Sequence, residues 1–318
     1  MKNIIKCARS PCNTGSHKTL SILALAGIGA FCGASPARAA PILGSDLASF
    51  TVLGAETVTN VPTSTIGGNV GVWSSGGANA ITGFSSVSGT ATADSQVTGG
   101  LVHAGTAAAQ SAQAQLTTAR INLDSLGAGI VLADGDLTLA GSLAPGVYTV
   151  PYAISNLTSA LTLDGGGNAN AAWVFQMESS LITSSNSVVN VINTGSDAGV
   201  YWNVRSSATI GTDTAFVGNI LALTSIWMNA TASDLCGRAL ADTGEVTLQM
   251  NSLNGICAGE LAGSNGLSGG LDVTAIPGGG TEVVFLPFVP TGTVPEPATL
   301  ALLSLGLLGL GFSRRRQG

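Results

Sequence analysis

The chain has 318 residues, of which 45% are hydrophobic, 9% are charged and 44 are glycine. An ordinary soluble domain has roughly 25% charged residues, and a disordered chain combines high charge with few apolar residues, so neither class fits. Between residues 40 and 295 the only cationic side chains are Arg120, Arg205 and Arg238, which excludes nucleic acid and anionic lipid as electrostatic partners.

Residues 1–39 have the pattern of a secretory signal peptide. A basic start is followed by an apolar stretch over residues 20–34 and by Ala37, Arg38 and Ala39, an A-x-A cleavage site. The alternative is a membrane anchor, but the apolar stretch is short and the cleavage site follows it directly. We therefore expect the exported protein to begin at Ala40.

Residues 104–126 form the one helix that the sequence predicts. Alanine and leucine recur there at spacings of three and four, which gives one apolar stripe along a helix. The stripe consists of Ala104, Ala108, Ala112, Leu116, Ala119, Leu123 and Leu126. Its small residues permit close packing against a sheet. The polar face includes Gln113 and Arg120, and the helix ends at Gly127.

The residues after the helix have the pattern of short alternating strands between turns rich in glycine, serine, asparagine and aspartate. A two-strand unit recurs about every 20 residues, which is typical of repeat architectures. Residues 216–222 correspond to residues 235–241, and residues 225–229 correspond to residues 245–249. This recurrence indicates a β-solenoid, whose successive rungs lie about 4.8 Å apart.

Cys236 and Cys257 are the cysteines that remain in the exported chain. They form an even pair in an oxidising compartment, and two cysteines without a nearby histidine make a poor zinc site. In a solenoid they would stand about one rung apart, which is compatible with disulfide geometry. We predict a Cys236–Cys257 disulfide, with two free buried thiols as the alternative.

Several segments between residues 43 and 258 resemble the DUF3494-type ice-binding protein family of bacteria and fungi, in the same order. They are residues 50–54, 66–71, 145–148, 173–176, 206–211, 216–225, 237–241 and 246–248. The resemblance implies an all-β fold: a discontinuous right-handed β-solenoid of triangular section, with one long α-helix packed alongside. It also implies that the N-terminal strands complete the solenoid out of sequence order.

The resemblance further implies adsorption to ice, through a flat face of short hydroxyl and methyl side chains that hold ordered water. Outward residues of a solenoid form straight columns, and the second strand of each unit supplies short polar side chains. The expected ice-binding residues are Thr183, Thr209, Ser225, Asn229 and Thr247. The same face is expected to carry Leu181 and Trp227, which are bulky, and Glu245, which is charged. An ordinary solvent-facing sheet is therefore the alternative.

Catalytic and metal-binding patterns are missing from the expected exported sequence. His103 has no cysteine or carboxylate at ligand or triad spacing, so we expect a surface histidine at the helix start. Asp134 and Asp136 flank a glycine but lack the ligand order of a calcium loop. We therefore predict no enzymatic activity, no cofactor and no metal site. The alternative function is a structural or adhesive protein of the cell surface or of an exopolysaccharide matrix.

The end of the sequence has three parts. Pro295, Glu296 and Pro297 precede an uncharged run over residues 298–312, and three arginines follow at 314–316. This order resembles the PEP-CTERM sorting signal of Gram-negative bacteria. The resemblance implies that an exosortase-type enzyme cuts near the two prolines while the hydrophobic helix is held transiently in the inner membrane, leaving the body released or attached outside the cell.

The expected organisation of the whole chain follows from these patterns. A signal peptide spans residues 1–39, and an ice-binding-like β-solenoid domain spans residues 40–260. A linker rich in glycine and proline, with one short apolar strand, spans residues 261–293. The sorting signal spans residues 294–318.

Overall fold

The computed structural model describes residues 40–74, 76–151, 154–276 and 278–291. This part of the chain is mainly β and has one α-helix, α1 (Ala107–Asp124), as predicted. The expected signal peptide, the sorting motif and the hydrophobic run over residues 298–312 lie outside the described residues. Within the described residues, no helix is long and apolar enough to cross a membrane.

A seven-stranded sheet is a parallel ladder of very short strands. In spatial order they are β13 (Ile154–Leu157), β16 (Ser180–Thr183), β19 (Ala208–Ile210), β21 (Ile226–Met228), β23 (Val246–Leu248), β3 (Val58–Asn60) and β6 (Ile81–Thr82). In β19, β21, β23 and β3 the first and last residues are buried and the middle residue is not. Each of these strands therefore presents one side chain outward.

A sixteen-stranded sheet contains two runs of mainly parallel strands. The helix-side run contains β10 (Ile130–Val131), β12 (Gly146–Val150), β15 (Ala172–Met177), β18 (Gly199–Val204), β20 (Ala215–Ala222), β22 (Ser233–Ala241), β2 (Phe50–Gly54), β5 (Asn69–Val72), β9 (Val102–Ala104) and the antiparallel β7 (Ala91–Thr92). The second run contains β11 (Ser142–Leu143), β14 (Ala160–Asn168), β17 (Val188–Thr194), β24 (Ser252–Asn254), β4 (Thr65–Gly67) and β8 (Val97–Thr98). The long strands β20 and β22 pair in both runs.

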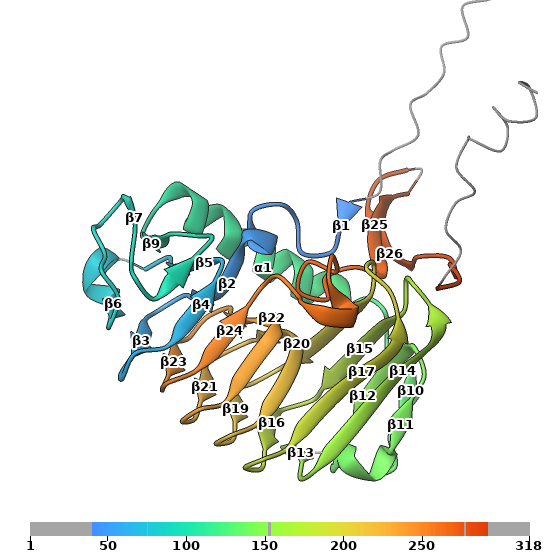
Figure 1. Ribbon diagram of the computed structural model, residues 1–318. Coiled ribbons are helices and arrows are strands. Elements are labelled where there is room, and N and C mark those ends of the chain that lie inside the picture. The colour runs from blue at the N-terminus through green and yellow to red at the C-terminus, as the bar shows by residue number, and fades with distance from the viewer. Residues whose placement is uncertain (1–39, 75, 152–153, 277, 292–318) are drawn as a thin grey trace, which may run out of the picture. The chain divides into compact units, whose positions relative to one another are not determined.

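The chain visits the three ladders in turn. β14 of the second run leads to β15 of the helix-side run, then to β16 of the seven-stranded sheet, and back to the second run at β17. The loop between β14 and β15 therefore joins the two runs of the sixteen-stranded sheet. It lies on the opposite side of the body from the seven-stranded sheet, as Figure 1 shows.

The N-terminal strands enter these ladders out of sequence order. β2 pairs with β22, and β3 pairs with β23, both in parallel register. The next strands, β4 and β5, extend the two runs of the sixteen-stranded sheet beyond them. Residues 50–72 therefore continue the ladders where residues 233–254 leave them.

Helix α1 packs on the helix-side run (Figure 1). Its buried side chains include the small residues Ala109, Ala112 and Ala119. Thr106 caps its start by accepting a hydrogen bond from Ala109 N (3.2 Å). The buried positions include Ala112 and Leu116, as predicted, but also Gln113 and Arg120, which we expected on the polar face. That expectation was wrong because the Gln113 amide donates to Asp242 O (2.7 Å) and Arg120 pairs with the Asp242 carboxylate (2.9 Å).

Four aromatic rings form a continuous row in the interior between the ladders, with the first three stacked and the last one tilted. The ring centroids of Tyr148 and Phe175 are 5.7 Å apart, those of Phe175 and Trp202 4.2 Å, and those of Trp202 and Phe216 4.9 Å. The Trp202 indole N–H is satisfied by Val217 O at 3.0 Å. Interdigitated rings of this kind leave the sheets little freedom to move.

Residues 261–291, expected as a linker with one strand, pack on the body. β25 (Leu271–Ala275) and β26 (Thr281–Phe285) pair with each other and with β1 (Ala40–Pro41) in an antiparallel sheet. Leu267 and Leu271 are buried. The short 3-10 helices are η1 (Leu47–Ser49), η2 (Gly77–Ala80), η3 (Leu137–Ala140) and η4 (Gly259–Leu261). The predicted Cys236–Cys257 disulfide is confirmed.

Candidate functional site

The outward side of the seven-stranded sheet carries one straight column of side chains. Strand pairing places them in direct register, in the order Asn156, Ile182, Thr209, Trp227, Thr247, Thr59 and Thr82. We call this set the outward column. Neighbouring members stand one strand spacing apart, about 4.8 Å. All seven side chains are exposed or half-buried.

The side chains on the other side of this sheet are closed into the core. Ala208, Ile210, Ile226, Val246 and Leu248 are fully buried. Because each three-residue strand has two anchored positions beside the outward one, the outward side chain is fixed in height and direction. The outward column is therefore a rigid, regular array.

Two of the five predicted residues, Thr209 and Thr247, lie on the outward column. Ser225 and Asn229 lie immediately before and after β21 and are half-buried. The Ser225 hydroxyl accepts a hydrogen bond from Glu245 N at 3.3 Å, so this serine ties neighbouring rungs together. Both residues flank the column rather than belong to it.

Thr183 is not on the outward face, and its predicted position was wrong. Its side chain is buried, accepts a hydrogen bond from Gly211 N (2.7 Å) and lies 3.2 Å from the Thr214 hydroxyl. The outward residue of β16 is Ile182, because Ile182 pairs with Thr209 in the ladder. Leu181, expected as a bulky outward residue, is also buried. Because the Thr183 hydroxyl has hydrogen-bond partners inside the protein, threonine can occupy an inward position where an apolar residue was expected.

Thr59 and Thr82 were missed because β3 and β6 join this sheet from the N-terminal part of the chain. Thr247 pairs with Thr59, and Thr59 pairs with Thr82, so three threonines follow one another in the column. The signal was present in the sequence, since Val58, Thr59 and Asn60 repeat the arrangement of Val246, Thr247 and Leu248. Its position next to β23 depends on pairing between distant segments.

Trp227 is the largest side chain of the column and is 39% exposed. Its indole N–H donates to one carboxylate oxygen of Glu245 (3.0 Å), and the Thr57 hydroxyl donates to the other (3.4 Å). The carboxylate therefore has partners on the protein, and the indole is held at its edge. Trp227 and Glu245, a bulky and a charged side chain expected on this face, are thus bonded to each other.

The three arginines of the described chain are engaged away from the outward column. Arg120 pairs with Asp242 under the helix, and Arg205 pairs with Asp124 and Glu178. Arg238 is buried and donates to Ala48 O (2.7 Å), Asn219 Oδ1 (2.8 Å) and the main chain of Asn265 (3.1 Å). Burial lowers the pKa of Arg238 to about 10, so this side chain stays charged at neutral pH.

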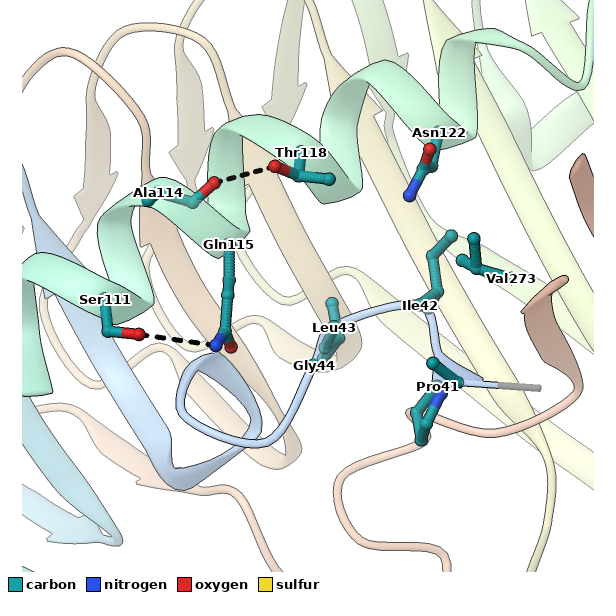
Figure 2. Close-up of a pocket in the computed structure, with 11 residues that line it drawn as sticks. Pro41, Ile42, Leu43, Gly44, Ser111, Ala114, Gln115, Thr118, Asn122 and Val273 are labelled. Atoms are coloured by element: carbon teal, nitrogen blue, oxygen red, sulfur yellow. Dashed lines mark hydrogen bonds between the residues drawn. The ribbon is translucent and has the colours of Figure 1, made fainter. Parts of the chain in front are cut away.

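A hollow of about 330 Å³ lies between residues 40–44 and helix α1 (Figure 2). Its walls are mainly apolar. The Gln115 amide donates to Asp46 (3.2 Å) and contacts Ser111 (3.5 Å), and Thr118 donates to Ala114 O at 3.0 Å. None of its described lining residues is titratable. Its lining therefore supplies no acid or base for catalysis.

His103 packs against neighbouring side chains at the start of the helix. Its ring contacts Phe50 edge-on at 5.1 Å, and its Nδ1 lies 3.1 Å from the Thr106 hydroxyl. Burial lowers its pKa. Within the described ranges, no group of three or more histidine, cysteine, aspartate or glutamate side chains is placed to hold a metal ion.

The sequence from residue 52 to residue 254 matches the ice-binding-like family model. The chain belongs to the ice-binding-like family. It is similar to an ice-binding protein of Nostoc sp. (strain HG1), with 36% identity over 95% of this chain and 97% of the relative. An ice-binding protein of Flammulina populicola is 31% identical over 72% of this chain and 94% of its own length.

Solved structures agree with this family assignment. A glycosylated ice-binding protein from an Arctic yeast aligns with a TM-score of 0.60 at 26% identity, over 69% of this chain and 96% of that chain. Proteins of the ice-binding-like family are non-enzymatic, so the chain is not an enzyme. Residues 293–316 match the PEP-CTERM sorting motif, which implies an exported, exosortase-sorted cell-surface protein.

Proposed function

We propose that this protein adsorbs to ice through the outward column of the seven-stranded sheet and limits ice growth or recrystallisation. The observation that carries the proposal is the in-register run Thr247, Thr59 and Thr82, with Thr209 beyond Trp227. The relatives named as ice-binding proteins support the activity. Ser225 and Asn229 are proposed as flanking residues that border the column.

The fold proposed for this function is a discontinuous right-handed β-solenoid of triangular section, with α1 packed alongside. Support comes from the three parallel ladders and from the order in which the chain visits them. A solenoid repeats the same outward position on every rung, so threonine hydroxyl and methyl groups recur at the strand spacing. Such an array can hold a layer of ordered water in fixed positions.

Charged side chains would disturb such a layer of ordered water, because an ion holds its own hydration shell. The engagement of all three described arginines elsewhere therefore favours ice over an anionic ligand. We propose a chain organised as signal peptide, ice-binding domain, packed C-terminal segment and sorting signal. The sorting signal would hold the protein in the inner membrane of a Gram-negative bacterium until an exosortase cuts near Pro295, Glu296 and Pro297.

The test is ice shaping and recrystallisation inhibition by the purified exported protein and two bulky variants. Thr247→Tyr places a ring on the outward column and should abolish ice shaping, while the midpoint of thermal unfolding changes little. Asn190→Tyr adds the same ring at an exposed position of β17 and should leave ice shaping intact. If both variants shape ice as the parent does, the column is not the site. An inactive parent protein that binds exopolysaccharide would instead support the matrix-attachment function.

A further inference from the structure

The last described residues are fixed to one corner of the body. Residues 286–291, which we call the strap, run along residues 165–170, which we call the corner loop. Ala169 N donates to Val289 O (2.6 Å), and Thr291 N donates to Gly167 O (2.7 Å). These main-chain bonds hold the chain in place up to Thr291.

Two asparagine side chains strengthen the same contact. The Asn170 amide donates to Pro287 O (2.8 Å), and Asn168 Oδ1 accepts from Val289 N (3.0 Å). Asn168 and Pro290 also form an antiparallel bridge. The strap is therefore joined to the body by both main-chain and side-chain bonds, in the manner of a short added strand.

The corner loop lies across the rung from the outward column. It contains the end of β14 and the first residues of the turn to β15, where the second run meets the helix-side run, while the seven-stranded sheet forms the third side. In Figure 1 the red C-terminal residues lie at the opposite side of the rungs from β16, β19 and β21. The strap thus leaves the body on the side away from Thr209 and Thr247.

Only three residues, 292–294, separate the strap from the sorting motif. A chain extends at most about 3.6 Å per residue, so Pro295 can lie no more than roughly 14 Å from Thr291. To reach the seven-stranded sheet along the outside, the chain would have to pass β15, whose six residues span about 20 Å. The chain between Thr291 and Pro295 is therefore too short to let the seven-stranded sheet turn towards the point of attachment.

We propose that the strap is an orienting tether. Once the sorting enzyme has attached the protein near Pro295, the corner loop faces the attachment surface and the seven-stranded sheet points to the surroundings. This inference rests on the proposed function in two respects, the exosortase cut near Pro295 and the naming of ice as what the outward column meets. The strap leaves the seven-stranded sheet accessible and shields the corner loop, whichever surface component the protein is attached to.

The test uses full-length protein in a bacterium that carries the matching exosortase. Thr247→Cys marks the outward column. Ser196→Cys marks an exposed loop whose neighbouring residues Thr194 and Gly195 contact the corner loop. A bulky maleimide should label the Thr247→Cys variant on intact cells as fast as in purified exported protein. It should label the Ser196→Cys variant severalfold more slowly on cells than in solution. Thr209→Cys provides a second mark on the column if the first variant misfolds.

A flexible insert tests the tether itself. A glycine-serine insert of about 20 residues after Thr291, with a root-mean-square span of about 25 Å, should remove the difference between the two sites. The same insert between Gly278 and Gly279, in the exposed turn between β25 and β26, leaves the tether length unchanged and should preserve the difference. Equal labelling of both sites without an insert would overturn the proposal. Because labelling needs no ice, its result can be interpreted even if the ice-shaping test fails.

Discussion

The seven-stranded sheet and the helix-side run are both parallel ladders, yet one has a bare outer surface and the other a covered one. In the helix-side run all six residues of β15 and of β18 are buried, because the interior lies on one side and α1 or the antiparallel sheet on the other. In the seven-stranded sheet burial alternates from residue to residue. The same backbone ladder thus serves as a wall of the core or as an exposed array, depending on what its outward residues contact.

The two regions also differ in how they use charge. Ion pairs and a buried arginine fasten α1, the N-terminal segment and the C-terminal segment to the sixteen-stranded sheet. The outward column carries hydroxyl, amide and apolar side chains, with Glu245 bonded beside Trp227. Charges stabilise the covered side, and their near absence leaves the bare side free to order water.

The largest expected effect comes from Arg238, which fastens the covered side. Arg238→Met leaves acceptors on Ala48, Asn219 and Asn265 without their donor and should lower the free energy of unfolding by about 3 kcal/mol. Arg205→Met removes only exposed ion pairs and should cost about 1 kcal/mol or less. Urea unfolding measures both. Equal losses would mean that the buried network contributes no more than a surface pair.

A smaller, pH-dependent effect is expected at Asp234, buried in β22. Burial raises the pKa of its carboxyl well above the ordinary value, against the opposing effects of Arg238 and the N–H groups of Cys236 and Gly218. The folded state therefore favours the neutral acid. The free energy of unfolding should fall, by up to about 1.4 kcal/mol per pH unit, as pH rises from the ordinary carboxyl pKa through the raised one.

Asp234→Asn removes the titrating carboxyl and should flatten the pH dependence of the free energy of unfolding. Thermal unfolding of parent and variant across the pH range measures the difference in stability between them. This difference should change in favour of the variant as pH rises. Parallel curves would show that the carboxyl does not titrate differently in the folded and unfolded states.

The smallest expected change in stability, but a gain in activity, comes from the bare side. Trp227→Thr would give the outward column an unbroken row of threonines from Thr209 to Thr82. We expect stronger ice shaping, with a stability change within about 0.5 kcal/mol. Trp73→Thr removes another exposed tryptophan and should leave ice shaping unchanged. Weaker activity of the Trp227→Thr variant would mean that the indole itself contacts ice.

Local patterns in the sequence predicted much of the covered side. Alanine and leucine spacing located α1, and the recurring strand pairs gave the repeat that placed Cys236 near Cys257. These features depend on residues close in sequence or on one repeat of the chain. Gln113 and Arg120 were misplaced because their buried acceptors lie on Asp242, which no helical pattern can reveal.

The bare side was only partly predictable. Thr209 and Thr247 followed from alternation. Thr183 did not, because a buried threonine can satisfy its hydroxyl on the main chain of the next repeat, and Ile182 is outward in its place. A one-residue shift of register reverses every side chain of so short a strand. Thr59 and Thr82 required knowledge of which distant strands pair, which local alternation does not contain.

The out-of-order pairing of β2 and β3 has a consequence for export. Thr57 and Glu245, which bond to each other, are 188 residues apart in sequence, and Ala48 and Arg238 are 190 apart. A chain that crosses the membrane from its N-terminus delivers β2 and β3 long before their partners β22 and β23. Contacts of such separation slow folding, so these rungs wait for the last third of the domain. The early part of the chain therefore stays open during translocation, and the ladder closes only after residue 248 has emerged.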